Sequence, residues 1–250
     1  TKSIFGYKVH LIVDGDHELP VDRKVTPGNV ADVTAAKELL IDNPSPRLEA
    51  LFDKAETLLG DKGYDFGDFK LDLWRKQDIK AVIDTRHLTK EKLQLVEGHD
   101  HVLYDQDGKV YCSSILTRQK RQMFFAGFEK DRESLKFRCP AVHSGTECEC
   151  MKQCPIASQI RIKLESDPRV FTAVSKDSYK WKRLYKKRTS VERVNSRFDV
   201  SLGFEDHYIR GLGKMSVMVD LSLIAMLGTA YGCIKEGKQE HMRSFVKAAS

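Results

Sequence analysis

One stretch sets the expectations for this chain: Tyr185-Lys-Lys-Arg-Thr-Ser-Val-Glu-Arg-Val-Asn-Ser-Arg-Phe198. At about 3.6 residues per helical turn, its tyrosine, its first arginine and its glutamate, Glu192, fall on one face. Val194 and Phe198 fall on another face, so the stretch predicts a helix with a core side and a cationic side. Taken alone, Glu192 is either a surface ion-pair partner or a functional carboxylate, and the rest of the chain must decide.

The composition is that of a globular protein with a mild basic excess. The chain has 250 residues, of which 41% are hydrophobic and 31% charged. This is enough for one large domain or two small ones, and it argues against a membrane protein. The net charge of +6 and the pI near 8.9 are compatible with a nucleic-acid partner.

The positive charge is concentrated between residues 160 and 197. Twelve Lys and Arg residues oppose four acids there: Arg161, Lys163, Arg169, Lys176, Lys180, Lys182, Arg183, Lys186, Lys187, Arg188, Arg193 and Arg197 against Glu165, Asp167, Asp177 and Glu192. A local excess of this kind is typical of a phosphate-binding surface. The alternative is a solvated face or a linker.

The first half of the chain has an α/β pattern. Hydrophobic periodicity predicts strands at 5–14, 19–26, 57–60 and 79–83, and helices at 31–41, 47–56 and 65–77. The inner side of the last helix is expected to hold Phe66, Phe69, Leu73 and Trp74. Asp61 directly follows the apolar strand 57–60, and functional groups in open α/β sheets gather at the carboxyl ends of strands. Asp61 is either such a group or a turn residue.

Residues 85–160 read as a small β-rich insertion. Short strands are expected at 101–104, 109–112, 123–128 and 134–139, with a hairpin turn at 105–108. The hydrophobic content of this segment is low, which suggests that it needs a stabilising cross-link, either a metal site or disulfides (a staple).

The cysteines offer that staple. The chain has no visible secretory signal, which favours metal ligation over disulfides. Four thiolates can build a tetrahedral zinc site, and the preferred set is Cys112, Cys139, Cys148 and Cys154, with Cys150 as a substitute for either of the last two. Neither half is a regular Cys-x-x-Cys, so isolated thiols and disulfides stay open. Cys233 is expected in the core.

The C-terminal part is expected to hold an extended segment at 204–209, a loop at Gly211 and Gly213, and an apolar helix at 215–233. That helix approaches the length of a membrane span. Its polar residues and glycines favour a helix buried in a core instead. Residues 235–250 form a polar tail that is expected to fray.

Two carboxylates beside a cationic surface suit a divalent metal ion acting on a phosphodiester. Asp61 and Glu192 are the candidates, and Mg²⁺ or Mn²⁺ is the ion that oxygen ligands prefer. Such sites generally need a third carboxylate. Asp14 ends a strand and is one candidate; the alternative is an acid encoded before Thr1, which would make this chain an N-terminally truncated fragment.

Four segments together resemble the DDE transposases of bacterial insertion sequences. They are Phe5-Gly-Tyr-Lys-Val-His-Leu-Ile-Val-Asp14, Leu19-Pro20 with Val25-Thr-Pro-Gly-Asn-Val-Ala-Asp32, Leu59-Gly-Asp-Lys-Gly-Tyr64, and Tyr185-x-x-Arg188-x-x-x-Glu192. The resemblance implies an RNase H-like fold in which three acids hold two Mg²⁺ ions. Asp61 matches the second acid and Glu192 the third, while Tyr185 and Arg188 match the residues that accompany that glutamate.

The resemblance also implies roles for individual residues, and the chain departs from the family pattern in two places. Lys62 flanks the second acid, and Lys62, Tyr185, Arg188 and Arg193 are the candidate DNA contacts. The family often has a lysine seven residues after the glutamate, where this chain has Asp199. The family's first aspartate lies on a strand before the Gly-Tyr-Lys segment, so the resemblance places it upstream of Thr1 rather than at Asp14.

The expected organisation follows from the resemblance. Residues 1–84 and 161–234 would be two parts of the RNase H-like core, residues 85–160 the insertion with its zinc-knuckle-like cysteines, and 235–250 the tail. The expected function is metal-dependent DNA cleavage and strand transfer in a bacterial, cytoplasmic, nucleoid-associated setting, with DNA and a second copy of the chain as partners and no membrane. The alternatives are a catalytically incomplete DNA-binding relative and a structure-specific nuclease on the same fold.

Overall fold

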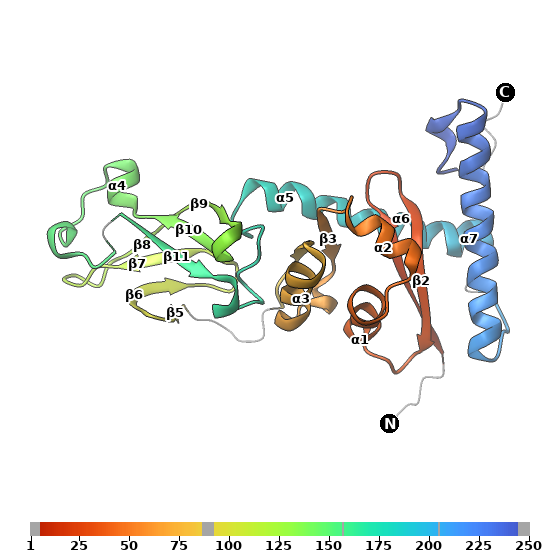
Figure 1. Ribbon diagram of the computed structural model, residues 1–250, viewed down its shortest axis with the longest axis horizontal. Coiled ribbons are helices and arrows are strands. Elements are labelled where there is room, and N and C mark those ends of the chain that lie inside the picture. Colours follow the sequence, from red (N-terminus) through yellow and green to blue (C-terminus); the bar gives the residue numbers. More distant parts are fainter. Residues whose placement is uncertain (1–5, 87–92, 157, 205, 245–250) are drawn as a thin grey trace. The chain divides into compact units, whose positions relative to one another are not determined.

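The computed structural model describes residues 6–86, 93–156, 158–204 and 206–244 (Figure 1). Phe5, the first residue of the first expected strand, and residues 245–250 of the tail lie outside this range. The chain divides into two compact units, one made of Thr1–Leu51 with Lys187–Ser250 and the other of Phe52–Lys186. These units do not coincide with the segments 1–84, 85–160, 161–234 and 235–250 that the sequence suggests.

The first unit is built on a β-hairpin. Strands β1 (Tyr7–Asp14) and β2 (Leu19–Pro27) pair antiparallel, with a register shift between Ile12 and Val13. The turn falls where the sequence predicts it. Helices of this unit are α1 (Asp32–Lys37), α2 (Pro46–Phe52, whose last residue falls at the boundary), α6 (Thr189–Ser196) and α7 (Leu212–Lys235).

Helices α6 and α7 share one hydrophobic cluster with the hairpin. Val194 and Phe198 are buried there, as the sequence predicts, together with Val219 and Met226 of α7. The Arg23 Nε–H of β2 donates to Asp220 of α7 at 2.8 Å. Apolar packing and this ion pair therefore fasten α7 along the hairpin.

The expectation that the apolar helix is buried is only half right. Met226 and Val219 are buried, but Val217 and Ile224 are more than half exposed. Among the described residues, α7 is one helix that is long and apolar enough to cross a membrane by length and composition. A single helix of this kind is weak evidence and does not indicate a membrane protein.

The second unit contains one parallel strand pair. Strands β3 (Thr57–Gly60) and β4 (Lys80–Ile83) are joined by α3 (Gly67–Gln77), so Gly60 lies opposite Ile83. Helix α3 buries Phe69, Leu73 and Trp74. The prediction that Phe66 faces the core is wrong: it is 40% exposed because it precedes the helix, and the Arg86 guanidinium lies 4.8 Å from its ring.

Two antiparallel sheets complete the second unit. The first has the order β5-β6-β7-β8 and the second the order β11-β10-β9. The strands are β5 (Gln94–Val96), β6 (His99–Tyr104), β7 (Val110–Ser113), β8 (Lys120–Gln122), β9 (Phe124–Glu129), β10 (Ser134–Arg138) and β11 (Gln159–Lys163), and the helices are α4 (Pro140–Ser144) and α5 (Tyr179–Tyr185). The expected strands are present, whereas β5, β8 and β11 were not predicted because they are short or rich in charged residues.

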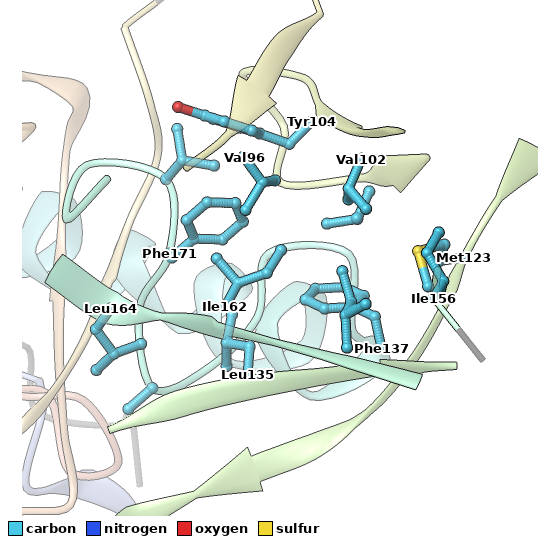
Figure 2. Packing of buried hydrophobic residues seen from close by; sticks show 14 of the residues in the cluster. Val96, Val102, Tyr104, Met123, Leu135, Phe137, Ile156, Ile162, Leu164 and Phe171 are labelled. Atoms are coloured by element: carbon cyan, nitrogen blue, oxygen red, sulfur yellow. The ribbon is translucent and has the colours of Figure 1, made fainter. Parts of the chain in front are cut away.

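The expectation of a thin core in residues 85–160 is wrong. The two antiparallel sheets enclose the largest cluster of buried side chains described, including Val102, Met123, Phe137 and Ile162 (Figure 2). Trp74 of α3 joins the same cluster, so the β-rich segment shares its core with neighbouring segments of the unit.

Several boundaries differ from expectation. Helix α1 gives way at Glu38–Asp42 to a π-helical turn, and α2 ends at Phe52 rather than at residue 56. In the described part of 204–209 no strand forms, and Gly213 lies inside α7 rather than in a loop. The tail begins with a 3₁₀ turn at Gln239–His241. The chain is a mixed α/β protein with several small sheets, in agreement with the expected α/β class.

Candidate active site

Asp61 presents a carboxylate at the carboxyl end of β3. Its Oδ1 accepts the Lys62 backbone N–H at 2.6 Å, which caps the 3₁₀ turn Lys62–Tyr64. Its other oxygen accepts no hydrogen bond from the described residues. Gly60 precedes it where a Cβ would lie 3.0 Å from the Ile83 side chain, so a larger residue would have to push that side chain aside. Asp61 is thus a capping residue with one carboxylate oxygen open to solvent.

Asp84 occupies the equivalent position after β4. Because Gly60 pairs with Ile83 in parallel register, Asp61 and Asp84 follow adjacent strand ends. The Asp84 carboxylate binds Lys176 Nζ at 2.7 Å and Lys62 Nζ at 3.1 Å. Burial alone would raise the pKa of Asp84, but the hydrogen bonds from Lys176 and Lys62 hold it below its ordinary value. The repeated strand-then-aspartate pattern could have revealed Asp84 from the sequence.

A buried ion pair holds the loop that follows Asp61. The Lys70 ammonium lies 2.7 Å from Asp65 Oδ1, and both side chains are almost fully buried. Asp65 Oδ2 accepts from Arg169 Nη2 at 2.7 Å and from the Arg86 backbone N–H at 2.8 Å. This network joins the ends of β3 and β4 to the segment around Arg169. Sequence patterns gave no signal for it, since its members are up to 104 residues apart.

Glu192 lies on the solvent side of α6. Its Oε1 pairs with the Arg188 guanidinium at 2.7 Å, one helical turn earlier, and its side chain is 55% exposed. The same helix is fixed to the hairpin turn: Arg193 Nε donates to Glu18 at 2.7 Å and Ser190 Oγ donates to the Gly15 carbonyl at 3.0 Å. Glu192 therefore lies on a helix that is anchored to the hairpin turn, and it is paired with Arg188.

The other candidate DNA contacts have partners within the chain. Tyr185 stacks on Trp181 with ring centroids 4.6 Å apart, in a cluster with Val82 of β4. Lys62 is paired with Asp84, and Arg193 with Glu18, as described above. The boundary between the units follows Lys186, so Tyr185 belongs to the second unit, whereas Arg188 and Glu192 belong to the first.

The Asp14 carboxylate is bound by residues of the turn that follows β1. Its carboxylate contacts the His17 ring nitrogen at 2.7 Å and accepts the Asp16 backbone N–H at 2.8 Å. Burial alone would raise the pKa of Asp14, but the contacts with His17 and with the backbone of Asp16 lower it. Asp14 thus closes the β1–β2 turn.

Five cysteines gather at one end of the β-rich segment. Cys112 lies on β7, Cys139 follows β10, and Cys148 and Cys150 lie with their sulfur atoms 3.4 Å apart. Burial raises the pKa of Cys112 to about 11, with a further rise from Cys139 and Cys148. Cys154 contributes to the same rise. All are free thiols, and Cys233 lies half-buried on α7.

The first unit also has an open groove of about 1030 Å³ beside β1. It is lined by apolar and aromatic side chains such as Tyr7, Phe198 and Phe204, with His207 and Arg210 at its polar positions. Neither Glu192 nor Arg188 lines it. The groove is therefore separate from the carboxylate that the sequence singles out.

No group of three or more His, Cys, Asp or Glu side chains in the described residues could hold a metal ion as placed. Asp61 and Glu192 nevertheless offer the oxygen donors that Mg²⁺ prefers, each with an oxygen that no described side chain occupies. Carboxylates that hold divalent ions, and lysine or arginine side chains that bind phosphate, are groups used by the class of enzymes that act on phosphodiesters.

The comparison with protein families identifies that class. The family model described as the transposase DDE domain matches residues 1–227, so the chain belongs to the transposase DDE domain family. No curated protein and no solved structure matches the chain. The chain is therefore a transposase domain, a nucleic-acid-processing enzyme that binds DNA, in a family that generally uses divalent metal ions such as Mg²⁺.

Proposed function

We propose that this chain cleaves DNA at the ends of an insertion sequence and transfers the cut strand to a target. The reaction comprises hydrolysis of a phosphodiester and attack of the freed 3′-hydroxyl on target DNA. Asp61 and Glu192 are the metal ligands in this proposal. The observation that carries it is the exposed, singly bonded carboxylate of Asp61 at a strand end, in a chain of the transposase DDE family.

The chain's own groups would orient the ligands. The Lys62 backbone N–H fixes one oxygen of Asp61 and leaves the other for a cation. Arg188 fixes one oxygen of Glu192 in the same way. When bound, a divalent ion supplies Lewis acidity that activates the attacking oxygen and stabilises the leaving one. Neighbouring cations neutralise the phosphate.

The test is strand nicking in Mg²⁺ by the full-length protein on DNA that carries the element ends. Asp61→Asn and Glu192→Gln should each lower the nicking rate at least about a hundredfold, because metal catalysis supplies several kcal/mol and about 1.4 kcal/mol is a factor of ten. Asp68→Asn and Glu49→Gln are matched controls, since both carboxylates are exposed and make no contact with described residues. Full activity in either test variant would remove that residue from the site.

A ligand-exchange experiment separates metal binding from a structural role. Asp61→Cys and Glu192→Cys replace an oxygen donor by sulfur, which Mg²⁺ binds poorly and Mn²⁺ accepts better. Nicking should vanish in Mg²⁺ and return in part in Mn²⁺. Loss of activity in both ions, with normal folding and DNA binding, would assign the residue to positioning rather than ligation.

The second candidate function is a DNA-binding relative that no longer cuts. It is favoured by Asp14, a candidate third acid, whose carboxylate is already engaged by His17 and the Asp16 backbone N–H in the β1–β2 turn. It predicts salt-dependent DNA binding by the natural full-length protein with no metal-dependent nicking. A structure-specific nuclease would nick DNA without joining the product to a target.

Several finer features belong to the same proposal. We extend the proposal to the RNase H-like arrangement, the insertion at 85–160, the bacterial and cytoplasmic setting and the homodimer. A structure with DNA tests the arrangement, and a mass measurement in solution tests the dimer. A zinc ion on Cys112, Cys139, Cys148 and Cys154 is proposed from the gathering of their thiols.

A further inference from the structure

Most of the positive charge between residues 160 and 197 is already neutralised within the chain. Carboxylates pair with seven of the twelve cations, several of them acids from other parts of the sequence. The pairs are Arg161 with Glu129, Lys163 with Glu165, Arg169 with Asp65, Lys176 with Asp84 and Asp107, Lys187 with Asp16, Arg188 with Glu192, and Arg193 with Glu18. The basic stretch as a whole is therefore not the phosphate-binding surface.

Three cations on α5 differ from these. Lys180, Lys182 and Arg183 are exposed, and their side chains make no hydrogen bond or ion pair with the described residues. Tyr179, at the start of the same helix, is 80% exposed. A cation without an internal partner keeps its full attraction for an external anion.

The packing of α5 forces these side chains outward. Trp181, Leu184 and Tyr185 pack against Val82 and Leu59 of the parallel strands, and the Ser178 hydroxyl caps the helix at the Trp181 N–H. At about 100° per residue, these three apolar residues lie on one side of the helix, and the three cations lie on the other side. The apolar side of α5 therefore anchors the cationic face on the strands that precede Asp61 and Asp84.

We propose that the outer face of α5 is a contact surface for the phosphate backbone of DNA, with Lys180, Lys182 and Arg183 as the contacts. Charge complementarity identifies the partner, and the placement of α5 on β3 and β4 puts the surface in the same compact unit as Asp61. The inference rests on the proposed function and adds the residues that position the substrate. The contact is independent of base sequence, since phosphates carry no base information.

The test compares two variants of the full-length protein with equal charge change. One carries Lys180→Gln, Lys182→Gln and Arg183→Gln. The control carries Lys120→Gln, Lys152→Gln and Arg138→Gln, which are exposed cations without a described side-chain partner, on β8, in the 3₁₀ turn Met151–Gln153 and at the end of β10. Duplex binding is measured by fluorescence anisotropy over a series of salt concentrations, and thermal melts verify folding.

The α5 variant should bind at least about tenfold more weakly at low salt, and the slope of log K against log salt should fall by up to about 3, or about 1 for each lost contact. The control variant should keep the natural slope. Lys180→Arg with Lys182→Arg should bind like the natural protein, because the charges stay. An unchanged slope in the α5 variant, or an equal loss of DNA affinity in both variants, would contradict the proposed contact surface. Failure of the natural protein to bind DNA would instead overturn the proposed function.

Discussion

At the residue scale, two aspartates close in sequence have opposite environments. The Asp61 carboxylate is exposed and, among the described residues, accepts only the N–H of the residue that follows it. Asp65 is fully buried and accepts from Lys70, Arg169 and the Arg86 backbone. Four residues apart, one carboxylate is available for chemistry and the other secures the loop. The difference comes from the partners that the fold supplies.

Asp65→Asn should destabilise the protein by about 3–5 kcal/mol at pH 7, because it leaves the Lys70 ammonium buried without its counterion. Urea unfolding followed by circular dichroism measures the loss. Asp68→Asn, in the exposed first turn of α3, should cost no more than about 1 kcal/mol, which is the contribution of a carboxylate near a helix N-terminus. Equal effects of the two substitutions would contradict the role of the buried pair.

The same pair predicts a dependence on pH. Burial alone would raise the pKa of Asp65, but the Lys70 charge and the hydrogen bonds from Lys70 and Arg169 lower it. A lowered carboxyl pKa stabilises the fold above the unfolded value of about 3.9 and loses that contribution as pH falls through the folded pKa. The difference between the natural protein and Asp65→Asn should therefore shrink below about pH 4.

At the element scale, the segment from α5 to α6 shows what hydrophobic periodicity predicts and what it does not. The periodicity of Tyr185–Phe198 correctly places Val194 and Phe198 on the core side. The structure interrupts the segment by a 3₁₀ turn at Lys186–Arg188, where the two compact units meet in sequence. Periodicity cannot reveal this division, because both helices bury apolar residues at the same spacing.

The cysteine-bearing elements carry the zinc prediction. Protein purified without chelators should contain about one zinc ion per chain by mass spectrometry, and Cys112→Ser with Cys139→Ser should lose it. Cys233→Ser on α7 is the matched control and should keep the metal. Because burial raises the pKa of Cys112 to about 11, binding must release its proton and should strengthen as pH rises. A metal-free, folded protein would dismiss the site.

At the scale of the whole molecule, each compact unit has its own hydrophobic cluster. The second unit is built around Phe137 and its neighbours, and the first around Val194 and Met226. Separate cores mean that damage to one unit need not unfold the other.

Phe137→Ala should cost about 3–5 kcal/mol and raise amide exchange mainly in β6, β7 and β9–β11, because Phe137 is fully buried. Met226→Ala is the reciprocal variant and should raise exchange in α6, α7 and the β1–β2 hairpin. Hydrogen exchange with mass spectrometry measures both. A uniform increase over the whole chain in either variant would show that the clusters unfold together.

Local patterns determined much of the architecture. The β1–β2 hairpin, β3 and the burial of Val194 follow from periodicity and turn residues, which act between neighbours in sequence. The same patterns singled out Asp61 and Glu192, and the family match over residues 1–227 agrees with the transposase reading of these motifs. They missed Asp84 and the size of the β-rich core, since that core collects side chains from many short strands.

The tertiary structure alone decided which charges are available. Arg193 pairs with Glu18, 175 residues away, and Lys176 reaches Asp84 on another element. In the sequence these residues form a basic stretch. Whether each one is ion-paired depends on distances of a few ångströms, which only the fold creates. It is the packing of Trp181 and Leu184 on β3 and β4 that leaves Lys180, Lys182 and Arg183 facing outward for a phosphate partner.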